Sequence, residues 1–313
     1  MRNKTKVFFI LFLLLMITIS MTGCRNAKNN EKAVQDKAIK ICDQMGREIS
    51  IEKTPERIVS LSPSNTEILF ALGLENKVVG VTNYCDHPEE AKRKEKIGNF
   101  AEPNLEKIVS LEPDLVLATS MHEKQVTQLD KLGIPTLVLE PKGMSDMLSS
   151  IELIGKATGS EDKALSLVTS LKERIDTIEE KVKDIPEDKK PLVYYELWPT
   201  PITTTGPGTF VDDLINRAGG RNIAADAKKA YPEYSQEVII KRNPDIIIFS
   251  HHGASQQSEE DIKARKGWES VNAIKNDKVF YVNENIVQRP TPRLVDGLEA
   301  IYDIISKKSG DKK

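Results

Sequence analysis

Short apolar runs alternate with amphipathic segments along most of this chain. A hairpin pattern opens the series, with residues 39–43 and 47–51 on either side of a turn at residues 44–46. Short apolar runs predict strands of a parallel sheet, and apolar positions spaced three or four apart between them predict helices. In the first half the predicted strands are residues 57–61, 77–81, 115–118 and 136–139, and the predicted helices are residues 65–72, 105–111 and 123–132.

A longer segment, residues 160–185, interrupts the alternation. It predicts one long amphipathic helix with no strand directly behind it, because its apolar positions recur every three or four residues: Leu165, Val168, Leu171, Ile175, Ile178 and Val182. The alternation then resumes. The second half has predicted strands at residues 192–197, 246–249 and 279–282, and predicted helices at residues 209–218, 236–241 and 292–306. The fold class is therefore α/β.

The two halves share a repeated motif. Residues 104–118 and 235–249 each contain a capping residue, a glutamate two positions later, an apolar turn, a Pro-Asp pair and an apolar strand. Glu106 precedes Pro113 by seven residues, as Glu237 precedes Pro244. The matched offsets predict two regions of common architecture. The alternative is a pair of unrelated helix–proline–strand units.

The N-terminus differs from the rest of the chain. Arg2, Lys4 and Lys6 precede a 13-residue apolar run at residues 7–19, and a membrane-spanning helix needs about 20 apolar residues. The run has the length of a signal-peptide core. The sequence Met21-Thr-Gly-Cys24 resembles a bacterial lipoprotein box, which predicts a signal peptide at residues 1–23, a lipidated Cys24 and a polar tether at residues 24–38. A plain signal peptide or an uncleaved anchor is the alternative.

Composition and charge narrow the class of protein. The 313 residues carry 45 Lys and Arg against 47 Asp and Glu, a net charge of −2. Loss of residues 1–23 removes three positive charges and leaves 290 residues with a charge of −5. This argues against nucleic acid as the main partner. No GxSxG, Walker A, GxGxxG or HExxH motif occurs, so we expect a binding protein rather than an enzyme, with no resident cofactor.

Six motifs carry a family resemblance: residues 57–67, 80–88, 104–114, 204–210, 218–222 and 289–293. They are similar to motifs of the substrate-binding proteins of ABC importers for cobalamin, siderophores and haem, and most resemble the cobalamin-binding branch. The resemblance spans residues 39–307. It implies two Rossmann-like α/β lobes, residues 39–159 and 186–313, joined by one long rigid helix at residues 160–185, with ligand in the cleft between the lobes.

The resemblance also implies a ligand site. Tyr84 and Phe100 match family positions that line the ligand, and Arg289 matches a ligand-facing arginine of the cobalamin branch. A corrinoid has flat apolar faces, and aromatic residues make up 5% of the chain, so Trp198 and Tyr231 are further candidates for the wall of the cleft.

Other readings of these residues remain open. Asn285 is a sixth candidate, at a position that is acidic in some relatives. Phe100 or Tyr84 can instead seal a loop onto the core, Trp198 can pack against neighbouring prolines, and Arg289 can pair within its own region. An aromatic residue that the family often has near Thr119 is missing here. Haem or a ferric siderophore is therefore the alternative ligand.

Histidines and cysteines have no diagnostic spacing. His122, His251 and His252 follow predicted strands and His87 lies near Cys85, so they are weak candidates for iron or cobalt ligands, and polar loop residues are the alternative. We expect no resident metal. Cys42 and Cys85 can form a disulfide outside the cytoplasm, or Cys42 can be buried with Cys85 facing solvent.

The repeated glutamates suggest a partner. Glu106 and Glu237 lie in the first turns of equivalent helices, where the helix dipole favours a carboxylate. The resemblance implies that each docks on an arginine of the permease dimer, which works with ATPase subunits. We expect an extracytoplasmic monomer, lipid-anchored to the bacterial cell membrane.

Overall fold

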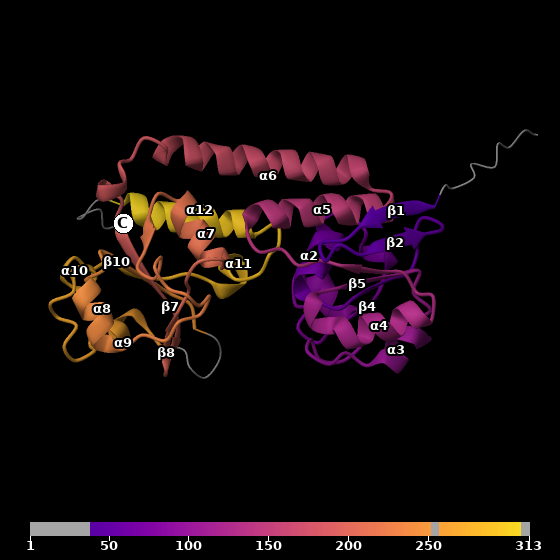
Figure 1. The fold of residues 1–313 in the computed structure, drawn as a ribbon, viewed down its shortest axis with the longest axis horizontal. Helices are drawn as coiled ribbons and strands as arrows, with labels where there is room; N and C mark the ends of the chain where they lie inside the picture. Colours follow the sequence, from indigo (N-terminus) through magenta and orange to yellow (C-terminus); the bar gives the residue numbers. More distant parts are fainter. Residues whose placement is uncertain (1–37, 252–256, 308–313) are drawn as a thin grey trace, which may run out of the picture. The chain divides into compact units, whose positions relative to one another are not determined.

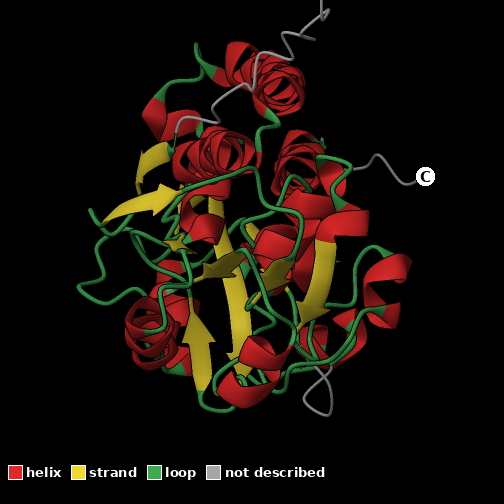
Figure 2. Cartoon of the chain, turned by 90° about the vertical axis from the view of Figure 1, so that its right-hand side faces the viewer, coloured by secondary structure: helices red, strands yellow, loops and turns green. Residues whose placement is uncertain are grey.

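The structure, a computed structural model, describes residues 38–251 and 257–307. These residues fall within one unit of the chain, Lys37–Lys313. Their strands form three sheets, and helices lie around the strands (Figure 2). The predicted leader, Cys24 and nearly all of the predicted tether lie outside the described residues.

Residues 38–159, hereafter the first half, contain a hairpin and a parallel sheet. Strands β1 (Ile39–Cys42) and β2 (Glu48–Ile51) pair antiparallel. The four-stranded sheet has the order β4-β3-β5-β6 and every pair in it is parallel. Its strands are β3 (Ile58–Ser60), β4 (Val78–Val81), β5 (Leu115–Ala118) and β6 (Thr136–Val138), and the helices that follow them are α2 (Pro63–Ala71), α3 (Leu105–Ser110) and α4 (Glu123–Lys131).

Residues 186–307, the second half, contain a mixed sheet. Its order is β11-β10-β7-β8, with β9 also paired to β7, and the β7–β8 pair is antiparallel. The strands are β7 (Leu192–Pro199), β8 (Ile202–Thr204), β9 (Arg221–Asn222), β10 (Ile246–Phe249) and β11 (Val279–Tyr281). The helices are α7 (Phe210–Arg217), α8 (Gln236–Arg242), α9 (Glu259–Lys263), α10 (Asn272–Lys275), α11 (Glu284–Val287) and α12 (Leu294–Ser306).

Two helices lie between the halves in the sequence. Helix α5 (Met144–Thr158) was not among the predicted helices, and α6 (Glu161–Val182) begins and ends inside the predicted residues 160–185. Gly159 joins them with a φ of 66°, a left-handed conformation that favours glycine. The two helices pack side by side (Figure 1), so closely that a Cβ on Gly155 would lie 2.4 Å from the Cβ of Ala164.

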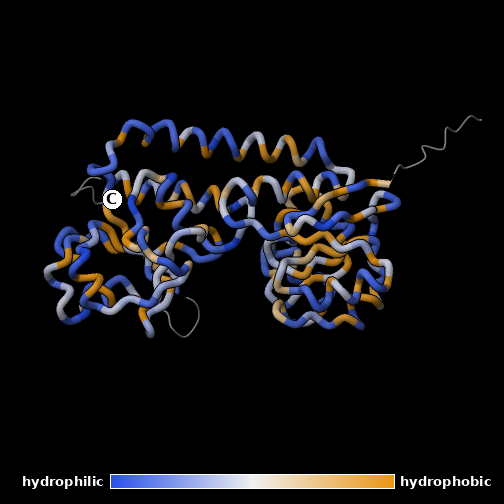
Figure 3. Tube along the Cα trace, viewed as in Figure 1, coloured by the Kyte–Doolittle hydropathy of each residue, from blue (hydrophilic) through white to orange (hydrophobic). Residues whose placement is uncertain are grey.

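The hydrophobic core explains why α6 is amphipathic. Its buried positions belong to the same core cluster as strand residues of both sheets, including Leu115 and Ile246. Figure 3 shows the alternation of hydrophobic and hydrophilic residues along this helix. On its polar side, Arg174 donates hydrogen bonds to Asp296 and Glu299 of α12, which fasten α6 to the second half. The α/β class with parallel sheets is confirmed, and the division into two lobes joined by one rigid helix stays a prediction.

The repeated motif folds in the same way twice. Glu112 and Asn243 both have a positive φ, 46° and 49°, directly before the two prolines. Each following aspartate then accepts backbone hydrogen bonds at the start of a neighbouring strand. Asp114 accepts from Glu56 and Arg57 ahead of β3, and Asp245 accepts from Leu192 at the start of β7. The matched offsets in the sequence therefore correspond to matched local structure.

Candidate ligand-binding site

A cavity of about 700 Å³ lies at the carboxyl ends of the first parallel sheet. The loops that follow its strands supply most of the wall, as expected for an open α/β sheet, in which ligands bind at this edge. A segment of the second half, Gln288–Pro290, completes it. Tyr84 and Phe100 lie between β4 and β5, Thr119 and Met121 follow β5, and Glu140 follows β6. Arg289 comes from the second half.

Two large apolar side chains that line the cavity are exposed. Tyr84 is 55% exposed and Met121 is 62% exposed, among the largest fractions for big apolar side chains in the described residues. Side chains of this size are normally buried on folding, so their exposure in a cavity indicates a contact surface for a ligand. Met121 occupies the part of the wall where the family resemblance leads one to expect an aromatic residue near Thr119.

Phe100 is held in place by a buried histidine. The His122 ring lies edge-on to Phe100, with centroids 5.3 Å apart at 88°. His122 Nε2 donates to the Phe100 carbonyl at 2.7 Å, and its Nδ1 accepts from the Thr119 N–H at 3.1 Å. Burial lowers the pKa of His122, so the ring is neutral and both of its nitrogens are engaged. His122 thus has no lone pair free for a metal ion.

Tyr84 lies on a loop that buried contacts of the next residue hold in place. Cys85, directly after it, is buried, and its thiol contacts the hydroxyls of Thr66 and Thr82 at 3.1 and 3.3 Å. Burial raises the pKa of the Cys85 thiol, which therefore stays protonated. Lys96 Nζ lies 3.3 Å from the Cys85 carbonyl oxygen. Anchored in this way, the loop presents Tyr84 to the cavity and Asp86 to the second half.

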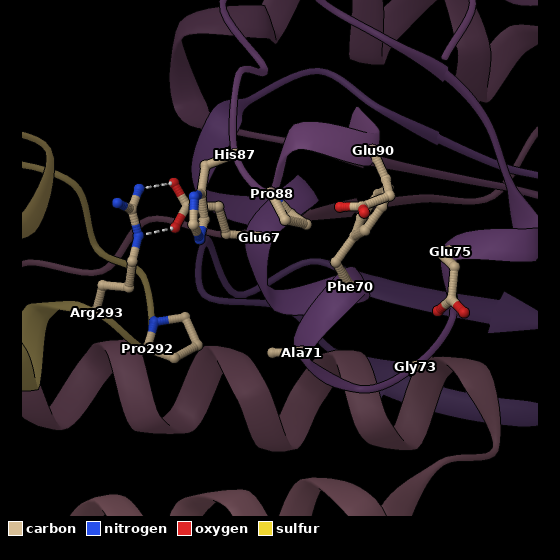
Figure 4. Close-up of a pocket in the computed structure, with 10 residues that line it drawn as sticks. All are labelled: Glu67, Phe70, Ala71, Gly73, Glu75, His87, Pro88, Glu90, Pro292 and Arg293. Carbon is tan, nitrogen blue, oxygen red and sulfur yellow. Dashed lines mark hydrogen bonds and ion pairs between the residues drawn. The ribbon is translucent and has the colours of Figure 1, made fainter. Parts of the chain in front are cut away.

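Four charged residues connect the two halves beside the cavity. Arg293, at the start of α12, donates two parallel hydrogen bonds of 2.7 Å to the buried carboxylate of Glu67 on α2 (Figure 4). Arg289 Nη1 lies 2.7 Å from Asp86 Oδ1 and 3.8 Å from Glu67 Oε1. Burial alone would raise the pKa of Asp86, but the hydrogen bond and charge of Arg289 outweigh it and lower the pKa.

A second cavity, of about 610 Å³, lies next to the Arg293–Glu67 pair, and His87 is among its lining residues (Figure 4). The histidine side chain is exposed. Residues from both halves line this cavity too, since Phe70 belongs to α2 and Pro292 directly precedes α12. The described residues around it offer no group of three potential metal ligands.

Three predicted ligand residues do not line the 700 Å³ cavity. The Trp198 indole N–H donates to the Thr200 carbonyl at 3.1 Å. Tyr231 is 57% exposed and lines a different cavity of about 510 Å³, together with Lys228 and Arg242. Asn285 lies in the short helix α11, two residues after its N-cap. The structure thus places Tyr84, Phe100 and Arg289 on one cavity, and the other three are not among its lining residues.

His251 is part of a buried ionic cluster at the end of β10. Its Nε2 lies 3.1 Å from Glu196 Oε1, and Arg265 donates two hydrogen bonds to the same carboxylate. Burial would raise the pKa of Glu196, but the bonds from Arg265 and His251 lower it, so the carboxylate is charged and compensated internally. His252 lies outside the described residues. In residues 38–251 and 257–307 no cluster of three His, Cys, Asp or Glu side chains is arranged to hold a metal.

Comparison with known proteins identifies the family. The family model described as "Periplasmic binding protein" matches residues 58–286, most of the chain. The chain belongs to this family. Its members are solute-binding proteins of transport systems rather than enzymes, and they work with permease and ATPase components.

Three relatives are similar over most of their length. An uncharacterized ABC transporter substrate-binding lipoprotein of Bacillus subtilis is 38% identical, covering 93% of this chain and 95% of its own. A structure from Staphylococcus epidermidis, described as a possible iron-binding (periplasmic solute-binding) protein, is 33% identical with a TM-score of 0.70, covering 82% of this chain and 100% of its own. The periplasmic vitamin B12-binding protein BtuF of Vibrio cholerae is 28% identical with a TM-score of 0.69, covering 80% and 97%.

The two glutamates of the repeated motif occupy equivalent places in their helices. Glu106 and Glu237 are exposed in the first turns of α3 and α8. Asn104 caps α3 by accepting a hydrogen bond from the Lys107 N–H, whereas the Ser235 side chain caps no backbone group of α8. A hydrogen bond from Ser235 instead lowers the pKa of Glu237. Neither glutamate forms an ion pair with another described residue, so both are available to a partner.

The cysteines differ from both sequence expectations. Cys42 and Cys85 are free thiols, so they form no disulfide in this structure. Cys42 is exposed and Cys85 is buried, the reverse of the open-thiol alternative. The reason is the pleat: in β1, Ile41 points into the core and its neighbours therefore face solvent. Cys85 lies on a loop, where no periodic pattern of residues predicts which side chains are buried.

Some lining residues were not singled out from sequence. Met121, Glu140, Ser62 and Ser64 all line the cavity. The available signal was their place directly after predicted strands 57–61, 115–118 and 136–139, since the carboxyl ends of parallel strands meet at one edge.

Among the helices of the described residues, none is both long and apolar enough to cross a membrane.

Proposed function

We propose that this protein captures a corrinoid, cobalamin, for an ABC importer and delivers it to the permease. The 700 Å³ cavity carries this proposal, because it combines the exposed side chains of Tyr84 and Met121 and the half-buried ring of Phe100 with a fringe of polar groups. A corrinoid offers flat apolar faces and a rim of neutral amides, which matches that combination. The vitamin B12-binding relative, with coverage of nearly its whole chain, supports the same ligand.

In this proposal the two halves are lobes and α6 is the rigid helix between them. The cavity is then the cleft, since its lining comes from loops of the first half and from Gln288–Pro290 of the second. The hydrogen bonds of Arg174 to α12 and the packing of α5 on α6 keep the long helix in contact with both lobes. Ligand binding is therefore accompanied by a small adjustment of the lobes rather than a wide closure.

Delivery depends on docking and anchoring. Glu106 and Glu237 form salt bridges to arginines of the two permease subunits, a role supported by their exposure and their equivalent helix positions. Exposed charges of this kind chiefly guide and orient an encounter between proteins.

Cys24 carries the lipid that keeps the protein at the outer surface of the cell membrane, a role supported by the lipoprotein relative. Mass spectrometry of the membrane fraction tests this by finding, or failing to find, an acylated Cys24.

An iron complex, haem or a ferric siderophore, is the second candidate. The iron-binding description of a 33% identical structure favours it. Isothermal titration of the full chain in detergent with cyanocobalamin, haemin and a ferric siderophore separates the two. We expect saturable heat with cyanocobalamin. Saturable binding of haemin or the siderophore, with none of cyanocobalamin, replaces the corrinoid assignment.

A further inference from the structure

Two residues that line the ligand cavity are charged, Arg289 and Glu140. The positive charge is already compensated, because Arg289 Nη1 lies 2.7 Å from Asp86 and 3.8 Å from Glu67. Glu140 differs, since it forms no ion pair with any residue in the described part of the chain. The cavity therefore has an uncompensated negative charge on its wall and no unpaired arginine or lysine to receive an anion.

Glu140 is held firmly in its place. Its Oε2 accepts a hydrogen bond from the Ser120 N–H at 3.1 Å, and its own N–H donates to Gln44 Oε1 at 2.7 Å. Gln44 lies in the turn between β1 and β2, and its Nε2 donates to the Asp146 carbonyl at 2.9 Å. These bonds fix one carboxylate oxygen and leave Oε1 without a partner among the described residues.

A fixed carboxylate in a partly enclosed cavity discriminates between ligands by charge. It accepts hydrogen bonds from N–H donors, and such charge-assisted bonds are stronger than neutral ones. It also opposes a second carboxylate, because like charges brought together away from water repel strongly. A ligand with primary amides on its rim offers N–H donors to this carboxylate. A ligand with a propionate or another carboxylate at the same place is repelled by it.

We propose that Glu140 is the specificity residue of this cavity, selecting a ligand with neutral amide groups and rejecting its carboxylate counterpart. The inference rests on the proposed function for the place of binding. It adds the chemical class of ligand rim that the cavity accepts. It also assigns a binding role to a residue that sequence motifs did not indicate.

The test compares two ligands that differ at one group. Cyanocobalamin and its monocarboxylic acids, each with one side-chain amide hydrolysed, are titrated into the full chain in detergent. We expect the wild type to bind cyanocobalamin at least about tenfold more tightly than one or more of the acids, and Glu140→Gln to reduce that ratio to near one. Glutamine keeps the oxygen that accepts from Ser120, so the loop is preserved.

Two controls separate charge from folding. Glu173→Gln removes the same charge from the exposed surface of α6 and is expected to leave the ratio unchanged. Thermal melting of Glu140→Gln checks that the variant folds as the wild type does. An unchanged ratio in a folded Glu140→Gln overturns the role of Glu140, even though the protein binds cobalamin.

A second ligand pair keeps the test independent of the corrinoid assignment. If cyanocobalamin does not bind, the proposed function fails and haemin is compared with haem dimethyl ester, which lacks the two propionate charges. A wild-type preference for the ester that Glu140→Gln abolishes supports the role of Glu140. Equal binding of the pair, or binding of none of these ligands, overturns it.

Discussion

Asp86 and Arg289 lie 203 positions apart in the sequence, and their side chains meet at 2.7 Å beside the ligand cavity. Asp86 is on the loop that presents Tyr84, and Arg289 precedes the start of α12. The pair therefore ties the wall of the cavity in the first half to the segment of the second half that completes it.

Removal of this pair is expected to have a small, pH-dependent effect on stability. The folded-state pKa of Asp86 is lowered, so its contribution is present above the ordinary pKa of 3.8 and is lost as the pH falls through the lowered value. The Asp86 side chain is 46% exposed, so the contribution is at most about 1 kcal/mol. Urea unfolding of Asp86→Asn at pH 7 and at pH 2 to 3 measures it. The loss is expected at pH 7 and is expected to shrink in acid, whereas Asp176→Asn, on the exposed face of α6, matches wild type at both.

The neighbouring Glu67–Arg293 pair is expected to respond unequally to loss of either partner. The Glu67 side chain is 3% exposed and that of Arg293 is 23% exposed. Arg293→Met leaves a buried carboxylate without its bidentate partner and is expected to cost about 3 kcal/mol. Glu67→Gln leaves the cation partly in water and is expected to cost less. Chemical denaturation of both variants checks the order, and the double variant with Glu67→Leu is expected to recover part of the loss. Equal costs would contradict the asymmetry.

Two exposed tyrosines provide a matched test of the cavity. Tyr84 is 55% exposed and lines the 700 Å³ cavity, while Tyr231 is 57% exposed and lines a different one. Tyr84→Ala is expected to weaken ligand binding by about tenfold or more, because it removes a large apolar contact. Tyr231→Ala is expected to leave affinity unchanged. Titration calorimetry compares the two variants, and a larger effect at Tyr231 would move the binding site to the cavity of about 510 Å³ that Tyr231 lines.

The paired glutamates are expected to affect transport without affecting binding. In Glu106→Ala with Glu237→Ala, uptake by cells should fall to background while ligand affinity stays at the wild-type value. The control is Glu123→Ala with Glu260→Ala, which removes two exposed carboxylates from the first turns of α4 and α9. This control variant should transport normally. If the carboxylates acted only by stabilising the helix dipole, the control and the Glu106/Glu237 variant would lose transport equally. Loss of affinity in the first variant would refute docking as its role.

Most strands of the sheets could be predicted from sequence, because strands that are buried along their whole length have continuous apolar runs. The apolar runs at residues 115–118 and 246–249 coincide with β5 and β10, and every residue of both strands is buried. A strand covered on both faces has a continuous apolar signal that is independent of the partner strand. Helix α5 was missed even though nine of its residues are buried, because its sequence lies between two clearer elements and no capping side chain marks its start.

Only part of the candidate site could be predicted from the sequence. Tyr84, Phe100 and Arg289 were predicted from the family resemblance and line one cavity. Trp198 and Tyr231 were predicted as aromatic side chains suited to a flat ligand, and Asn285 from its family position, and none of the three lines that cavity. Residue type identifies a side chain able to contact a flat ligand. It does not say on which side of a loop the side chain points.

The sequence alone determined the class of fold and the places where strands end, because apolar periodicity and turn chemistry act over a few neighbouring residues. Only the tertiary structure decided which strand ends meet, that Arg289 is already paired with Asp86, and that Glu140 is left uncompensated on the wall of the cavity. Such relationships join residues that are distant in the sequence, by 203 positions for Asp86 and Arg289. The energy of a charge depends on its partners and its exposure to water, and both are properties of the folded chain.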